Sequence, residues 1–240
     1  MLKITMNEKE YLLQKKDNVQ LKNEGTYGNG SIDWGARGLY LYEIAEQLNV
    51  KHPVAALVEG TISVLNTFIT KDSKVMFLTS EDEEGQKILA RTGEFLLCYG
   101  VYSTLAPSVQ RVGHGIEDGL IVYADVILPI DAPMTGLPLE EIQCNVDSIV
   151  QRGNTITTKK LAYFPVVRTL REVNELYMLE QIERLDDGGP VTVHMLESYF
   201  DLYHGLLLSD FQMIQQIKLL YAENDMNKWR IYAKVDLKLE

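Results

Sequence analysis

The feature that most constrains the fold is the run from Ser80 to Leu105, SEDEEGQKILARTGEFLLCYGVYSTL. Ser80 and Glu83 have the spacing of a capping box, in which both side chains accept hydrogen bonds from backbone amides at the start of a helix. Ala106-Pro107 ends the run, because proline disfavours helical geometry in the residue before it. We therefore predict one long helix that organises the rest of the chain. Its expected apolar face consists of Ile88, Leu89, Thr92, Leu96 and Tyr99.

Composition limits the functions open to the chain. Its 240 residues, 46% of them hydrophobic, suffice for one sizeable core or two small domains. A net charge of −11 argues against non-specific binding to DNA, which depends on lysines and arginines that neutralise phosphates. Cys98 and Cys144 do not form a CxxC pair, so we expect no structural zinc and no cofactor. Without a secretory or membrane-spanning apolar run, we expect a cytoplasmic protein with no membrane partner.

Residues 1–79 alternate between short strand patterns and one helical pattern. Leu2–Met6 and Glu10–Gln14 are expected to form a hairpin around Asn7 and Glu8. A helix over Leu39–Leu48 follows, and then three strands: Val54–Val58, Thr61–Val64 and Lys74–Leu78. This β-β-α-β-β-β order is the β-grasp pattern of ubiquitin-like folds.

A glycine-rich insertion at 18–38 interrupts this first segment. It contains two aromatic residues, Tyr27 and Trp34, which are candidates for contact with a partner. Disorder is the alternative, because loops of this length are usually either functional or disordered.

The segment that follows the long helix mixes strands and amphipathic helices. Ser108–His114 and Gly119–Val126 are expected strands around a turn at Gly115–Gly119, in which Asp-Gly is a strong turn signal. Helices are expected over Pro138–Gln151 and Pro165–Leu179. The fold class is therefore α+β, with helices packed on an antiparallel sheet. The other expected strands are Thr157–Tyr163, Val191–Met195, Tyr199–His204, Gln216–Ala222 and Lys228–Val235.

Several stretches resemble threonyl-tRNA synthetases in order and spacing. Leu78–Leu97 resembles the junction between their TGS and editing domains, and Val112–Asp125 resembles a glycine-containing turn of the editing domain. Asn174–Ile182 and Tyr199–Gly205 resemble two later segments. The resemblance implies a TGS-like β-grasp domain over 1–79. It further implies an editing-like domain over 80–240, of the second additional domain type that threonyl- and alanyl-tRNA synthetases share.

The same pair of domains also precedes the kinase domain of uridine-kinase-like nucleoside kinases. Their version of the last motif is closer to Asp201–Leu207 than the synthetase version is. The chain has no GxxxxGK[ST] motif, so a kinase domain would have to lie downstream in a longer protein. Leu239-Glu240 is a candidate cloning remnant, and the sequence leaves open whether the chain is a fragment of such a longer protein.

The synthetase resemblance also implies which residues an active editing site would need. The positions of its two HxxxH histidines are occupied by Arg91 and Phe95, and those of its CxxxH motif by Tyr203 and Leu207. Met178 stands at the position of the pocket lysine. Phe95 and Leu207 cannot transfer protons or bind metal, and an arginine stays protonated. We therefore expect no catalytic residues and no zinc site of the alanyl type, although the family's aspartate is kept as Asp201.

Other residues around this degenerate editing site could form a ligand pocket. Arginine and tyrosine side chains can bind a phosphate or stack on a base, and a salt bridge between Arg91 and Asp201 is the alternative. His114 and His204 could instead replace the lost acid–base pair, if they lie on the same side of the cleft; the other histidines are His52 and His194. The candidate pocket residues are Arg91, Phe95, His114, Met178, Tyr199, Asp201, Tyr203, His204 and Leu207.

Three functions follow from this sequence. The first is a non-catalytic binding or regulatory module, with tRNA or another RNA, a nucleotide, or a partner domain as its ligand. The second is a trans-acting aminoacyl-tRNA editing hydrolase with a rearranged site. The third is a structural module that assembles with a kinase domain or a second copy.

Overall fold

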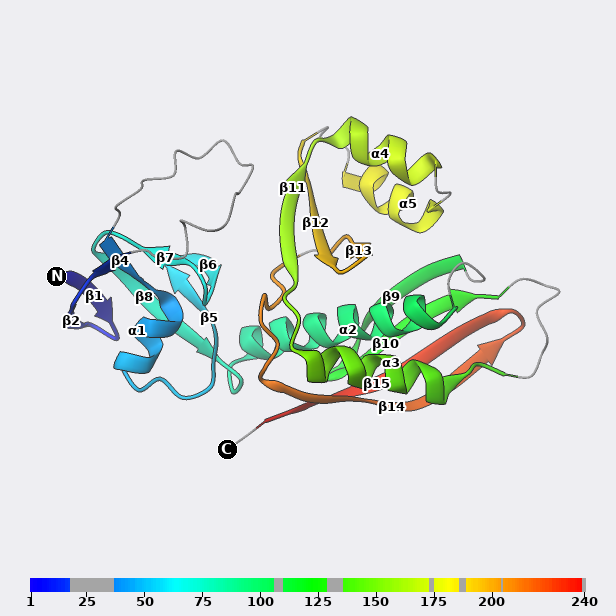
Figure 1. Ribbon diagram of the computed structural model, residues 1–240, viewed down its shortest axis with the longest axis horizontal. Helices are drawn as coiled ribbons and strands as arrows, with labels where there is room; N and C mark the ends of the chain where they lie inside the picture. The colour runs from blue at the N-terminus through cyan, green and yellow to red at the C-terminus, as the bar shows by residue number, and fades with distance from the viewer. Residues whose placement is uncertain are drawn as a thin grey trace. The chain divides into compact units, whose positions relative to one another are not determined.

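The computed structural model describes residues 1–17, 37–105, 110–128, 136–172, 175–185, 189–203 and 205–238. The chain forms two compact units, Met1–Gly85 and Gln86–Glu240. Helices and mostly antiparallel sheets make up both, which confirms the predicted α+β class (Figure 1). Within the described residues, no helix is long and apolar enough to cross a membrane. Three features named above lie outside these residues: His204, Leu239-Glu240 and most of the 18–38 insertion, including Tyr27 and Trp34.

The first unit has a five-stranded sheet in the order β2-β1-β8-β5-β6. Only β1 and β8 run parallel, and this order with a parallel central pair is that of the β-grasp fold. The hairpin turn lies at Asn7 and Glu8, both with positive φ, as predicted. The strands of the sheet are β1 Leu2–Met6, β2 Lys9–Leu13, β5 Pro53–Val58, β6 Thr61–Val64 and β8 Ser73–Thr79.

Helix α1, Leu41–Gln47, buries Leu41, Ile44 and Ala45 in the core of this unit. It begins two residues later than predicted, because Leu39 and Tyr40 pair with Ile69 and Phe68 as the end of a strand. The short strands of this region are β3 Lys16–Asp17, β4 Arg37–Tyr40 and β7 Phe68–Ile69.

The predicted long helix is α2, Glu83–Leu105, and the predicted cap at Ser80 is wrong. Asp82 immediately precedes the helix, and its carboxylate accepts hydrogen bonds from the Thr79 amide (2.6 Å) and hydroxyl (2.8 Å). The strand therefore turns tightly into the helix. At the site of this turn, a Cβ on Gly85 would come 1.8 Å from the Thr79 carbonyl oxygen.

Helix α2 is buried on all sides from Thr92 to Val101, not on one face as predicted. It packs against a four-stranded sheet in the order β14-β15-β10-β9 and against α3, Leu139–Arg152. Gly93 and Gly100 permit this approach, since a Cβ on either would come 2.2 Å from a methyl group of Val235 or Val146. The strands are β9 Gln110–Asp118, β10 Ile121–Ile127, β14 Ile214–Asp225 and β15 Lys228–Leu237.

Strand β9 runs through the residues predicted as a glycine turn. The chain reverses at Gly119 and Leu120, so the Asp-Gly signal was correct but the turn is shorter than predicted. His114 consequently lies within the strand, opposite Ala124 of β10.

A second sheet, β11-β12-β13, and two helices complete this unit. The single helix predicted over Pro165–Leu179 is wrong, because the segment forms α4, Tyr163–Glu172, and α5, Leu176–Leu185. The amide of Glu175 donates to the carbonyl of Leu170 (2.9 Å), a bond of the kind that closes helix ends. The strands are β11 Thr157–Leu161, β12 Val191–Leu196 and β13 Tyr199–Asp201.

Candidate functional site

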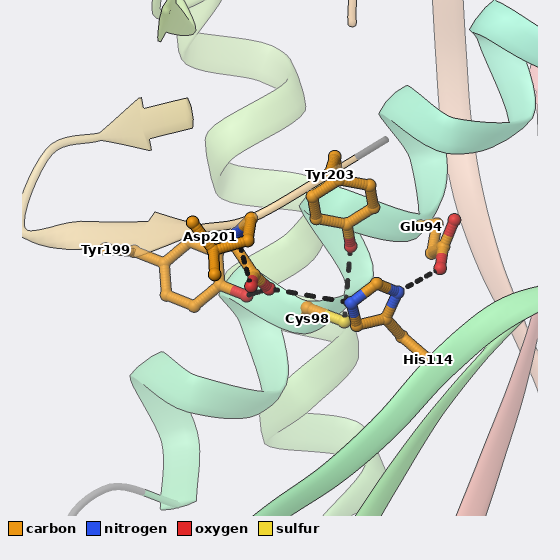
Figure 2. Close-up of polar contacts among 7 residues, drawn as sticks. Glu94, Cys98, His114, Tyr199, Asp201 and Tyr203 are labelled. Carbon is orange, nitrogen blue, oxygen red and sulfur yellow. Dashed lines mark hydrogen bonds and ion pairs between the residues drawn. The ribbon is translucent and has the colours of Figure 1, made fainter. Parts of the chain in front are cut away.

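A polar and aromatic cluster lies where three parts of the second unit meet (Figure 2). Helix α2 contributes Glu94 and Cys98, one turn apart, and β9 contributes His114. Strand β13 and the residues after it contribute Tyr199, Asp201 and Tyr203. The structure thus brings His114, Tyr199, Asp201 and Tyr203 together and adds Glu94 and Cys98, which were not among the candidate pocket residues.

His114 lies between two carboxylates. Its Nδ1 contacts Glu94 Oε1, and its Nε2 is 4.0 Å from Asp201 Oδ2 (Figure 2). When this carboxylate is ionised it can only accept, and the donor of the contact is then Nδ1–H of His114. The contact with Asp201 is too long for a hydrogen bond. The His114 ring also stacks on Tyr203, with ring centroids 4.5 Å apart, and the side chain is 12% exposed.

Asp201 is completely buried, and its hydrogen bonds differ from the salt bridge with Arg91 that was the alternative to a ligand pocket. Oδ2 accepts a hydrogen bond from the Tyr199 hydroxyl (2.7 Å), and Oδ1 accepts one from the Leu202 amide (2.7 Å). Arg91 lies instead against Gly205, where a Cβ would come 2.9 Å from its Nη1.

Tyr203 contributes a buried phenol to the cluster. Its hydroxyl lies 3.8 Å from Cys98 Sγ, within hydrogen-bonding distance for sulfur. Burial raises the pKa of Tyr203 well above its ordinary value, and nearby acidic groups raise it further. The phenol therefore stays protonated at neutral pH and cannot act as a base.

Phe95 packs against two aromatic rings of the cluster. Its ring centroid lies 5.2 Å from that of Tyr199 and 5.6 Å from that of Tyr203, and it is completely buried. Leu207 is also buried, and Met178 belongs to the apolar core shared by α4, α5 and β12. Phe95, Met178 and Leu207 therefore pack as core residues, and the two tyrosines present almost no surface on which a base could stack.

His194, on β12, was not among the candidate pocket residues. It lies opposite Asp201 on one side and Thr158 on the other, and its Nδ1 is 2.9 Å from the Thr158 hydroxyl. Its buried Nε2 has no hydrogen-bond partner among the described residues. Burial lowers the pKa of His194, and Asp201 opposes this only in part, so the imidazole is neutral at pH 7.

The cluster has limited chemical capacity. The Glu94–His114 contact fixes the orientation of one imidazole, whereas Phe95, Met178 and Leu207 offer only apolar side chains. In the parts of the chain that the structure describes, no group of three or more His, Cys, Asp or Glu could hold a metal ion.

The chain is similar in sequence to threonine–tRNA ligases. It is 30% identical to that of Clostridium kluyveri over 213 residues, which are 83% of this chain and 32% of the ligase. It is 28% identical over 187 residues to that of Caldanaerobacter subterraneus subsp. tengcongensis, which is 77% of this chain and 28% of the ligase. It is 27% identical to the ligase of Clostridium tetani over 224 residues, which are 89% of this chain and 34% of the ligase.

No family model matches the chain. The chain spans about a third of the length of these ligases. Over most of its own length, then, this chain is related to threonyl-tRNA synthetases.

Proposed function

We propose that this chain is an RNA-binding module that keeps the fold of a synthetase editing region and does not hydrolyse aminoacyl-tRNA. The similarity to threonine–tRNA ligases supports RNA as the ligand class. In this proposal residues 1–79 are a TGS-like domain and residues 80–240 an editing-like domain. The parallel with uridine-kinase-like proteins, a downstream kinase domain and a cytoplasmic location stay predictions.

One observation carries the loss of catalysis. Phe95 and Tyr203, at positions matched to an editing histidine and cysteine, are buried with their ring centroids 5.6 Å apart. Editing requires a water molecule held beside a base and close to the ester. Packed aromatic rings at these positions exclude such a water.

Two assays on the same protein test this proposal. We expect a tRNA labelled at its 5′ end to bind in a filter assay, with an affinity that falls as salt rises. We also expect a mischarged threonine-type tRNA to lose its amino acid at the uncatalysed rate. Binding of neither tRNA nor other RNA would contradict the module and favour a structural role.

The Glu94–His114 contact favours a second candidate function, hydrolysis at a rearranged site. A carboxylate that orients an imidazole is the arrangement used by general bases. Under this candidate, deacylation would exceed the uncatalysed rate and would fall in both His114→Ala and Glu94→Gln. Under the first proposal, neither substitution changes the rate.

A further inference from the structure

The sheet β14-β15-β10-β9 has a second face, opposite to the one packed on α2. Successive residues of a strand point to opposite faces, and Val122, Ala124, Ile231 and Ala233 are buried on the α2 side. Tyr123, Tyr232 and Tyr221 pair directly across three neighbouring strands on the other side. We call this outward surface the tyrosine face.

The three tyrosines form a row. Ring centroids are 6.2 Å apart between Tyr123 and Tyr232, and 4.6 Å apart between Tyr232 and Tyr221. Tyr221 is 51% exposed at the end of the row. At the other end Tyr123 lies over Gly115, where a Cβ would come 2.5 Å from the Tyr123 hydroxyl. The guanidinium of Arg230 lies 4.1 Å from the Tyr123 ring centroid.

Positive charge adjoins this row, although the chain carries a net charge of −11. Lys218 and Lys234 are directly opposite each other, next to the tyrosines. Lys234 is about half exposed and forms an ion pair with Asp236 (3.1 Å) near the surface. Such a pair is weak and gives way readily to a phosphate.

The buried carboxylate on this face is already neutralised. Asp125 accepts two hydrogen bonds from Arg230 (2.7 and 2.8 Å) and lies 3.1 Å from Lys228 Nζ. Burial alone would raise the pKa of Asp125, but Arg230 and Lys228 outweigh it and hold the pKa below its ordinary value. Two exposed carboxylates also act on Tyr221: Glu117 of β9, and Glu223, which lies opposite Arg230 and accepts a hydrogen bond from the Tyr232 hydroxyl (3.4 Å).

We propose that the tyrosine face binds single-stranded RNA, with bases stacked on Tyr221 and phosphates held by Lys218 and Lys234. Exposed sheets with outward aromatic residues bind single strands in this way, and stacking tolerates any base. This assignment rests on the proposed RNA-binding function. It places the ligand on a different surface from the degenerate editing site.

The test measures binding of a fluorescently labelled, single-stranded RNA dodecamer by anisotropy. Tyr221→Ala should weaken binding about tenfold, in line with the usual loss of one stacked base. Tyr221→Phe keeps the ring and should bind as the wild type does. Phe164→Ala removes another exposed ring, on α4, and should have no effect.

Salt dependence tests the phosphate contacts. Removing two phosphate contacts with a Lys218→Ala/Lys234→Ala variant should reduce the slope of log K against log salt by about 1.4. Lys159→Ala/Lys160→Ala, on exposed β11, is the matched control and should leave the slope unchanged. Glu223→Gln removes a negative charge beside Tyr221 that repels the RNA phosphates, and it should therefore tighten binding.

The outcomes separate this assignment from the proposed function. Failure of the wild-type chain to bind any RNA would overturn both. Wild-type binding that Tyr221→Ala and the double lysine variant leave unchanged would overturn the tyrosine face alone. Circular dichroism of each variant confirms that it is folded.

Discussion

Phe95→Ala tests whether the position that the resemblance matches to an editing histidine is part of the core. Phe95 is completely buried and pairs with two aromatic rings. Truncation of a buried phenylalanine to alanine costs about 3–5 kcal/mol, and each aromatic pair contributes about 0.5–1.5 kcal/mol beyond its buried area. We therefore expect Phe95→Ala to lower the free energy of unfolding by about 4–5 kcal/mol, near the top of the range for a buried phenylalanine.

Urea unfolding followed by tryptophan fluorescence measures this loss. Trp229, on β15, reports on the second unit when the chain's other tryptophan, Trp34, is replaced by phenylalanine in every variant. With a slope of about 2 kcal/mol per molar urea, the midpoint should fall by roughly 2 M. Phe164→Ala, at an exposed ring, should change the free energy of unfolding by less than about 0.5 kcal/mol. A loss below about 1.5 kcal/mol for Phe95→Ala would refute the reasoning.

Three further predictions use the same unfolding assay. Because the pKa of His194 is lowered in the folded chain, the unfolded chain binds a proton at this imidazole more readily. The free energy of unfolding should therefore be highest above the ordinary pKa of 6.5 and should fall as the pH drops below it. His194→Gln should remove this slope, which is at most about 1.4 kcal/mol per pH unit; an unchanged slope would contradict the assignment. Gly93→Ala should destabilise the second unit by about 1–3 kcal/mol, because its Cβ would come 2.2 Å from a Val235 methyl group. Val235→Ala should rescue part of that loss, so additive losses in the double variant would count against the packing. Asp125→Asn should lower the free energy of unfolding by about 2 kcal/mol. This is less than the loss for a fully buried ion pair, because Arg230 and Lys228 are partly exposed. A change below about 0.5 kcal/mol would show that these ion pairs do not stabilise the fold.

Local signals in the sequence predicted most of the elements. Turn residues such as Asn7 and Gly119 marked hairpins correctly, because the positive φ at these positions favours glycine, asparagine and aspartate. The break between α4 and α5 could not be predicted in the same way. Apolar residues keep helical spacing through it, and both helices bury them in one core.

The candidate site was predictable only in part. The synthetase resemblance placed Phe95, Asp201 and Tyr203 together, and the hairpin turn at Glu197-Ser198 would have set His194 opposite Asp201. The Glu94–His114 contact depends on how α2 packs against β9, which no local pattern specifies. A glutamate inside an apolar helical run was the one signal for it, since buried carboxylates are usually paired.

The most direct test of the account is the rate of deacylation of a mischarged threonine-type tRNA that is saturated with this chain. Filter binding on the same sample establishes that the tRNA is bound. We predict that the bound ester is lost at the rate of the free ester in buffer. Faster loss that His114→Ala abolishes would contradict it and assign a working hydrolytic site to the Glu94–His114 pair.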